Sequence, residues 1–391
     1  MSTPSTPPKK SWSWRSQAFR GLIYQVVTVV LIVLVVLYLA NNTNTNMRAR
    51  GIQSGFDFMM GGAGFDIGES LFPYDSADPY WKAFLVGFVN TLRVAVVGIV
   101  LTTILGTLIG VGRFSRNALV RGLCLCYVEF FRNIPILLQL LMWYLMFTEV
   151  LPESAAPLTL GPFFLSKGGL NFPIPVWSSG YTLGAWGLLA GVVAAVFYRR
   201  YAHASFERTG VPKSTVLAPI GIAIAFGILG WLLGGAPMEM NRPVQGEFAI
   251  ENGGALTPEY MSVLLGLTVY TASFVAEVVR GGIQSVALGQ SEAASALGLA
   301  RGQTMRLVML PQALRVIIPP LTNQYLNLTK NSSLAVAIGY PDVVSIANTA
   351  INQTGRAVEC IAIIMLVYLS TSLFTSVMMN WYNNRSAIQE R

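Results

Sequence analysis

The polar segment between residues 281 and 311 interrupts an apolar chain, and its residue types suit contact with another protein. It reads Glu292-Ala293-Ala294, three residues, Gly298, nine residues, and then Val308-Met309-Leu310-Pro311. The alanines favour a short helix with a thin profile, which can enter a groove on a partner. Ser291 is the expected N-cap of this helix, and Glu292 then lies beside its positive end.

The residues after this helix are expected to turn the chain and to begin a second arm. Gly298 permits the turn, which leaves Leu297 as an apolar contact for the partner. A second short helix is predicted over residues 304–310, with Pro311 at the entry to the next apolar segment. The segment therefore predicts a docking element, although its alanine-rich composition is equally consistent with an amphipathic helix on a membrane surface.

Polar side chains inside apolar segments form a second group, because they are costly in a bilayer unless they are paired or functional. Lys330 and Arg132 can donate to an anionic group of a solute, and asparagine side chains can donate or accept. The alternative role for each polar residue is to hold helices together by hydrogen bonds. The candidates for substrate contact are Arg132, Gln139, Asn323, Asn327, Lys330, Asn331, Ser332 and Ser333.

Two glutamates lie three residues before an arginine, which is a spacing for an ion pair on one helix face. Glu129 precedes Arg132 and Glu277 precedes Arg280, so we expect structural pairs at both places. Pro135 is expected to break the first of these helices. A broken helix inside a transporter can present free backbone groups to a ligand, so internal pairing and substrate contact are both open for Arg132.

Enzymatic chemistry has little support in this sequence. One histidine, His203, and three cysteines, Cys124, Cys126 and Cys360, make a metal site or a disulfide framework improbable. No phosphate-binding loop and no Ser/His/Asp arrangement occur. The net charge of +8 is scattered and not gathered in an aromatic-basic strip, so we expect no nucleic-acid partner. We therefore expect no catalytic residue, no metal and no cofactor bound by this chain.

The composition places most of the chain in a membrane. Charged residues make up only 11% of the 391 residues, against about 25% in soluble domains. Apolar runs that match the length needed to cross a bilayer predict an all-α polytopic membrane protein with about eight transmembrane helices. We interpret the first run as a retained span and not as a signal peptide, because no cleavage site follows it. The predicted spans are 21–40, 84–112, 123–148, 181–198, 215–235, 259–280, 312–340 and 357–380.

The basic residues of the connecting segments predict the orientation, because Lys and Arg accumulate in cytoplasmic loops. Eight spans with the N-terminus inside place every strongly basic segment in the cytoplasm, together with both termini. The segment 41–83 is then periplasmic. The cytoplasmic segments are the tail 1–20, the loops 113–122, 199–214 and 281–311, and the end 385–391.

The segment 292–311 resembles the EAA loop of the membrane subunits of type I binding-protein-dependent ABC importers. The family pattern is EAA, three residues, Gly, nine residues, Ile, one residue and Leu-Pro, and this chain departs from it only in Val308. Three more segments are similar to the polar amino acid uptake (histidine/glutamine/arginine) branch, with departures at Asn133, Ile134 and Asn331 that leave the substrate range open. These segments are 127–135, 276–282 and 328–334.

The resemblance implies an importer transmembrane domain over residues 84–384, with a core of five spans. The pair of spans within 181–235 is an insertion into that core, and 281–311 is the cytoplasmic coupling loop. This insertion, the extra span 21–40 and the Phe-rich loop within 41–83 make the chain similar to the larger permease subunit of the general L-amino acid ABC transporter group.

The same resemblance implies the translocation-channel subunit of an ATP-driven amino acid importer in the bacterial inner membrane, working by alternating access. ATP and Mg are expected on a partner, an ATP-binding cassette ATPase dimer. The other implied partners are a periplasmic substrate-binding protein and a second, paralogous permease subunit, with a heterodimer favoured. The residues expected to couple the channel to the ATPase are Glu292, Ala293, Ala294, Leu297, Gly298, Leu310 and Pro311.

Two other classes of function compete with an importer subunit. An ion-coupled secondary amino acid transporter or a channel needs no motor, but a repeat of spans with paired broken helices is expected in such a transporter and is not visible in the sequence. A membrane scaffold has no use for the polar residues in the span predicted at 312–340.

Overall fold

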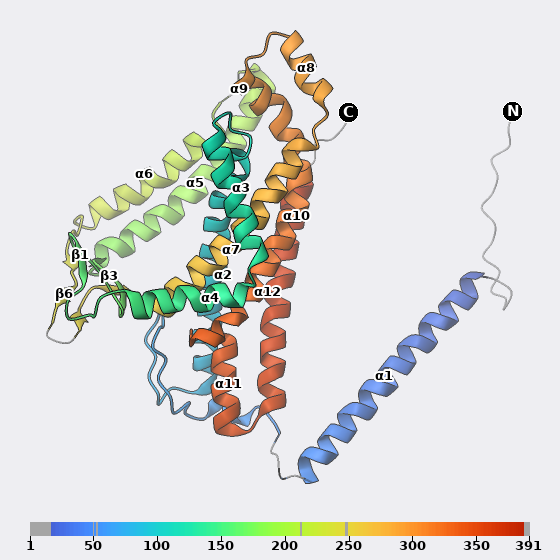
Figure 1. Ribbon diagram of the computed structural model, residues 1–391, viewed down its shortest axis with the longest axis vertical. Coiled ribbons are helices and arrows are strands. Elements are labelled where there is room, and N and C mark those ends of the chain that lie inside the picture. The colour runs from blue at the N-terminus through green and yellow to red at the C-terminus, as the bar shows by residue number, and fades with distance from the viewer. Residues whose placement is uncertain (1–16, 50, 52–53, 212, 247–248, 387–391) are drawn as a thin grey trace. The chain divides into compact units, whose positions relative to one another are not determined.

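The computed structural model describes residues 17–49, 51, 54–211, 213–246 and 249–386 (Figure 1). The predicted tail 1–20 and end 385–391 therefore lie largely outside the described residues. Helices dominate, as the apolar runs predicted. The main helices are α1 Gln17–Ala49, α2 Tyr80–Gly112, α3 Ala118–Asn133, α4 Ile136–Leu145, α5 Ser179–Thr209, α6 Leu217–Leu233, α7 Pro258–Gln284, α8 Leu288–Ala296, α10 Leu310–Asn331, α11 Val343–Thr354 and α12 Ala357–Ser386. The shorter helical pieces are η1 Asp57–Met60, η2 Met146–Val150, α9 Arg301–Gln303, η3 Thr304–Met309 and η4 Ser332–Ile338.

Short strands in the segments after η2 and after α6 are an addition to the predicted all-α fold. One antiparallel sheet has the order β1-β2-β3-β8, while β4 pairs with β5 and β6 with β7. Strands this short hold too few residues to display an alternating pattern, so the sequence did not predict them. Their bounds are β1 Leu158–Leu160, β2 Phe163–Ser166, β3 Gly169–Phe172, β4 Ile174–Pro175, β5 Met240–Asn241, β6 Val244–Gln245, β7 Ile250–Glu251 and β8 Gly254–Leu256.

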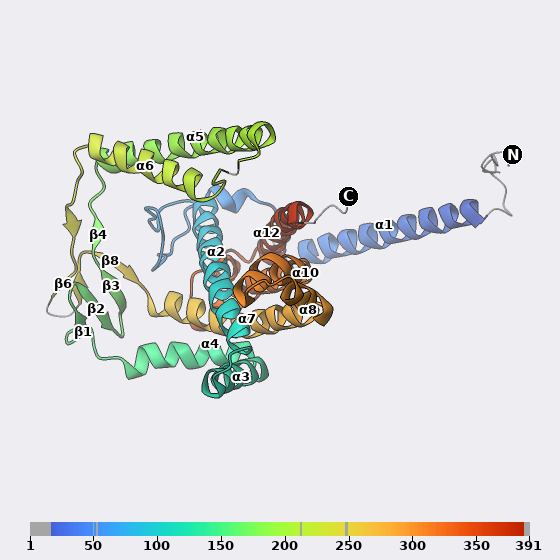
Figure 2. The same cartoon turned by 90° about the horizontal axis from the view of Figure 1, so that it is seen from above.

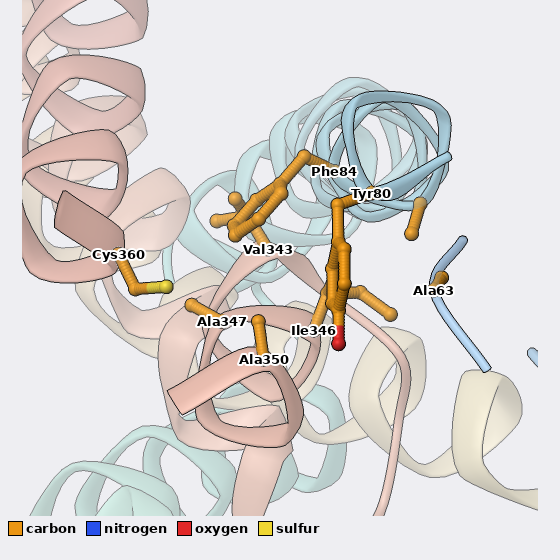
Figure 3. Packing of buried hydrophobic residues seen from close by; sticks show 9 residues of the cluster. Ala63, Tyr80, Phe84, Val343, Ile346, Ala347, Ala350 and Cys360 are labelled. Carbon is orange, nitrogen blue, oxygen red and sulfur yellow. The ribbon is translucent and has the colours of Figure 1, made fainter. Parts of the chain in front are cut away.

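The chain divides into two compact units, and each has its own core. The first unit comprises Met1–Leu92 and Pro341–Met378, and the second comprises Arg93–Tyr340 and Met379–Arg391. The core of the first unit forms where Tyr80 and Phe84 pack with residues of α11 and with Cys360 (Figure 3). These side chains are at most 6% exposed, so they form a tightly closed cluster.

The Phe-rich segment before α2 is fastened to this core. The rings of Phe58 and Tyr80 meet edge to face with centroids 5.5 Å apart. The buried Arg356 guanidinium pairs with Asp57 at 3.0 Å, which holds the segment from a second side. The Gly55 amide also donates a hydrogen bond to the Glu359 carboxylate at 2.6 Å. The segment is thus a structured part of the first unit.

Helix α7 is central to the second unit, because α3, α4 and α10 all pack against it. Helix α2 approaches it closely through two glycines spaced four residues apart. A Cβ atom at Gly106 would lie 2.6 Å from the Val275 side chain, and one at Gly110 would lie 2.8 Å from the Ala276 carbonyl oxygen. Small residues at this spacing let two helix backbones touch. The contact fixes the end of α2 beside the last turns of α7.

The span predicted at 123–148 is broken, as Pro135 predicted. Helices α3 and α4 meet at an angle of 104°. Pro135 adopts an extended conformation, and it cannot donate a hydrogen bond to the turn before it. The Gln139 side-chain amide donates to the carbonyl oxygens of Phe131 and Ile134, both at 2.9 Å. Because Gln139 is 1% exposed, its side chain replaces the helix bonds that the bend removes.

The predicted insertion forms a helical hairpin, in which α5 and α6 pack against each other along their length (Figure 2). Helix α5 has 31 residues, but α6 has only 17, which is shorter than the roughly 20 residues that cross a bilayer.

Five helices among the described residues are long and apolar enough to cross a membrane, and up to seven spans result when each of two bent pairs counts as one. The chain is therefore a multi-pass membrane protein. The long helices are Phe19–Met47, Tyr80–Gly112, Ser179–Thr209, Pro258–Gln284 and Ala357–Trp381.

Candidate functional site

The short helix predicted around Glu292 is present, but it begins earlier than the sequence predicted. Helix α8 starts at Leu288 after the extended residue Ala287, so Ser291 lies inside the helix and is not its N-cap. The Ser291 carbonyl instead accepts a hydrogen bond from the Ser295 hydroxyl at 2.8 Å. Glu292 consequently lies beyond the first turn, so the positive end of the helix does not stabilise its carboxylate as expected. The prediction failed because capping side chains favour a helix start without excluding an earlier one.

The turn at Gly298 has the predicted form. Gly298 has φ of +74°, in the left-handed region that glycine occupies without strain. Its amide donates to the Ser295 carbonyl at 3.0 Å, and the Leu299 amide donates to the Ala294 carbonyl at 3.1 Å. These two bonds make a Schellman motif, which satisfies the last carbonyls of α8. The end of the helix is therefore rigidly closed.

The side chains of α8 divide into an inward and an outward set. Ala294 is buried, and α8 packs against η3. Glu292 and Ala293 are exposed, and Leu297 is 81% exposed at the end of the helix. Figure 1 shows α8 at the end of the second unit where α10 begins. The exposed set forms a free surface with one carboxylate and one large apolar side chain.

The second arm of the segment is a helix that runs into α10 without a break. The short helix predicted over 304–310 is wrong in extent, since α9, η3 and α10 follow one another directly from Arg301. Leu310 and Pro311 lie in the first turn of α10. The preceding six residues form wider π-helical turns. Because Pro311 has no N–H for the preceding turn, a widened turn there avoids a clash.

One face of α10 carries the polar residues singled out in the sequence. Asn323, Asn327 and Lys330 are spaced four and three residues apart, and all three are exposed. The helix continues through Pro319 and Pro320 without ending. In the described part of the chain, no side-chain hydrogen bond or ion pair engages these three polar residues. The helix thus presents free amide and ammonium groups along one stripe.

The polar residues at the end of α10 have local partners. The buried Ser332 hydroxyl donates to the Thr329 carbonyl at 2.7 Å, and the Ser333 hydroxyl donates to the Lys330 carbonyl at 2.8 Å. Asn331 is half-buried. The two serine hydroxyls close the helix end, so their donors are already used, although their oxygens can still accept.

A charge cluster forms around Glu277 of α7. Its carboxylate pairs with Arg113, with Arg280 at 2.8 Å and with Arg132 at 3.8 Å. The expected Glu277–Arg280 pair is present. Arg132 pairs with Glu277 and not with Glu129, which forms no ion pair among the described residues. In the sequence, Arg113 counts only as one of the basic residues of the loop 113–122. The spacing of Gly106 and Gly110 indicates close contact of α2 with another helix, and this signal could have placed Arg113 beside α7.

Residues 98–387 match the family described as binding-protein-dependent transport system inner membrane component. The chain belongs to this family. The motif carried by α8 and the stripe on α10 both lie within the matched residues of this permease. The resemblance drawn from the 292–311 segment is therefore confirmed at the level of the family.

Three relatives of the permease align with it along nearly their whole lengths. The general L-amino acid transport system permease protein AapQ of Rhizobium johnstonii is 47% identical over 97% of this chain and 96% of its own. The putative amino-acid ABC transporter permease protein YhdX of Escherichia coli is 43% identical over both full lengths. The glutamate/glutamine/aspartate/asparagine transport system permease protein BztB of Rhodobacter capsulatus is 38% identical over both full lengths.

Proposed function

We propose that this permease forms part of the translocation pathway of an ATP-driven importer, and that α8 couples it to a separate ATPase. The exposed surface of Glu292, Ala293 and Leu297 on a rigidly closed helix carries the proposal. A thin helix with one carboxylate and one apolar end suits a groove that has a basic and an apolar wall. Because α8 packs on η3 and η3 runs into α10, movement of α8 displaces α10.

The cargo is an amino acid. The three relatives described above are amino acid permeases by name, and they align with this chain nearly from end to end. Their names range from general L-amino acids to four acidic and amide amino acids, so they support the class of cargo and no single member. Nothing in these relatives supports the alternative of an ion-coupled secondary transporter.

The proposed substrate contacts centre on the polar stripe of α10. Lys330 offers an ammonium group to a carboxylate, and Asn323 and Asn327 offer amide oxygens to an ammonium group. Gln139 uses its amide donors at the helix break, but its Oε1 atom has no hydrogen-bond partner and remains an acceptor. Arg132 is 38% exposed and retains donors beyond its long contact with Glu277. Asn331, Ser332 and Ser333 are the remaining candidates at the end of the stripe.

A second permease subunit is the proposed neighbour of this stripe. Placing unpaired amide and ammonium groups against lipid costs free energy. The cost is avoided where these groups face a water-filled path between two subunits. A paralogous partner is favoured because the two halves of a zwitterion need different groups. The family name itself supports a substrate-binding protein as the donor of cargo.

Eight spans with both termini in the cytoplasm of a bacterial inner membrane are proposed for the permease. The five long helices, two bent pairs and the shorter α6 support this count. The basic segments then lie together on the side of α8, in agreement with the cytoplasmic bias of Lys and Arg. The transmembrane domain is proposed over 84–384, with the α5–α6 insertion within 181–235.

The coupling role is tested by Glu292→Lys in the complete importer reconstituted in vesicles. Uptake is expected to fall by at least about tenfold while membrane insertion is unchanged, because losing one partner of an interfacial charge pair costs about 2–5 kcal/mol. ATP hydrolysis should no longer respond to loaded binding protein. Glu207→Lys is the matched control, since Glu207 is also exposed and lies at the end of α5. Normal uptake by Glu292→Lys contradicts the coupling role.

A further inference from the structure

A cavity of about 420 Å³ opens between the end of α2, the start of α3 and the end of α7. We call it the arginine cavity, because Arg113, Arg121 and Arg280 line it. The lining also includes Phe114 and Leu125, and it contains no Asp or Glu among the described residues. Neither the coupling helix nor the polar stripe of α10 contributes to it.

The arginine cavity carries excess positive charge. Arg113 and Arg280 share the carboxylate of Glu277, which is not part of the lining. Arg121 is exposed and forms no ion pair within the described residues. Arg132 also approaches the Glu277 carboxylate, at 3.8 Å, so this one carboxylate is divided among three arginines. Three guanidinium groups against one carboxylate suit a phosphate, which guanidinium binds through paired hydrogen bonds.

The walls of the cavity are the ends of apolar helices. Gly112 ends one helix able to span a membrane, and Gln284, which lines the cavity, ends another. The cavity therefore lies at the boundary of the membrane. Phe114 and Leu125 in its lining are each 43% exposed, and Leu123 on α3 is 62% exposed. An anionic head group attached to apolar chains matches both the arginines and this apolar border.

We propose that the arginine cavity binds the phosphate head group of an anionic phospholipid, with the acyl chains along the exposed leucines of α3. Basic pockets between membrane helices are suited to such head groups. The first residue of α3, Ala118, also lines the cavity, and the positive end of this 16-residue helix adds to the attraction. The proposal goes beyond transport and does not depend on the identity of the cargo.

A bound head group would link three helices. Phosphate between Arg121 of α3, Arg113 after α2 and Arg280 of α7 offsets the repulsion among their guanidinium groups. Free phosphate can make the same contacts with the arginines, but it does not cover the apolar border of the cavity. Free phosphate and a phospholipid are therefore distinguished by whether acyl chains strengthen binding.

The test uses the full-length permease, purified with its accompanying subunits and examined by native mass spectrometry. The probes are phosphatidylglycerol, phosphatidylcholine and inorganic phosphate, each at the same concentration. The variant is Arg121→Gln, which leaves the Glu277 cluster intact. Arg116→Gln is the matched control, because Arg116 is exposed in the turn between α2 and α3 but does not line the cavity.

The wild-type complex is expected to retain phosphatidylglycerol in preference to phosphatidylcholine. Arg121→Gln should retain about fivefold less, the effect of one arginine near an anionic surface, while Arg116→Gln retains as much as the wild type. Equal loss in both variants, or no loss in Arg121→Gln, overturns the proposal. Binding of inorganic phosphate as strong as that of phosphatidylglycerol overturns the lipid source. Unchanged thermal unfolding of Arg121→Gln in phosphatidylcholine confirms that the variant is folded.

Discussion

Arg113, directly after α2, and Glu277 of α7 form an ion pair although 164 positions separate them along the chain. Their side chains are only 13% and 19% exposed. The same carboxylate accepts a hydrogen bond from Arg280 Nε at 2.9 Å and faces Arg132 of α3. One carboxylate therefore holds together the ends of three elements that meet in the second unit.

Replacing Glu277 by Gln is expected to destabilise the permease by about 3 kcal/mol, because three arginines then lack their carboxylate in a largely buried place. The measurement is thermal or chemical unfolding of the purified protein in detergent. Glu129→Gln is the control: Glu129 is exposed and without an ion pair in the described part of the chain, so its replacement should change stability by less than about 0.5 kcal/mol. Equal stability of the two variants would show that the cluster is not a structural centre.

Two glycine-to-alanine variants separate helix propensity from helix contact. A Cβ at Gly110 would lie 2.8 Å from a backbone oxygen of α7, so Gly110→Ala should lose about 1–3 kcal/mol by forcing α2 away from α7. A Cβ at Gly281, on α7 itself, meets nothing within 4 Å, so Gly281→Ala should be neutral or stabilising by up to about 1 kcal/mol. Yield of folded protein and unfolding midpoint report the difference. Similar behaviour of both variants would exclude close packing at Gly110.

Gln139→Leu is expected to weaken the bend between α3 and α4. The change removes both donors to the Phe131 and Ile134 carbonyls, and buried acceptors without partners cost about 1–3 kcal/mol each. Unfolding measurements should register the loss of stability, and the KM for uptake by the surviving protein should rise, because the change also removes the Oε1 acceptor proposed for the substrate. An unchanged KM with lowered stability would assign Gln139 to bracing alone.

Lys330→Met is expected to raise the KM for amino acid uptake by about tenfold or more, because a hydrogen bond to a charged group contributes about 1.5–3 kcal/mol. Folding should survive, since Lys330 is exposed and without a side-chain partner among the described residues. Lys330→Arg keeps the charge and is expected to retain most of the activity. The two variants are compared by uptake of labelled amino acids into vesicles. Unchanged KM in Lys330→Met would remove this residue from the proposed site.

Local patterns predicted most of the helices and the turn at Gly298. Apolar runs predict helices because a segment in lipid has to satisfy all its backbone hydrogen bonds internally, and a helix does so without other segments. The break at Pro135 and the left-handed turn at Gly298 depend on the covalent geometry of single residues, so they too were predictable. The start of α8 was not, because Ser291 competes with several neighbouring residues for the cap position.

Contacts between distant segments needed the tertiary structure. The partner of Arg132 proved to be Glu277 of another helix and not its neighbour Glu129, since tertiary packing brought the more distant carboxylate closer. The pairing of β3 with β8 likewise joins segments on either side of the inserted hairpin. The sequence by itself determined the family motif, the membrane character and the helices, all of which arise from local composition and spacing. Only the tertiary structure decided which charges meet, which face of α10 stays free and where the arginine cavity lies, because these depend on how closely whole helices pack.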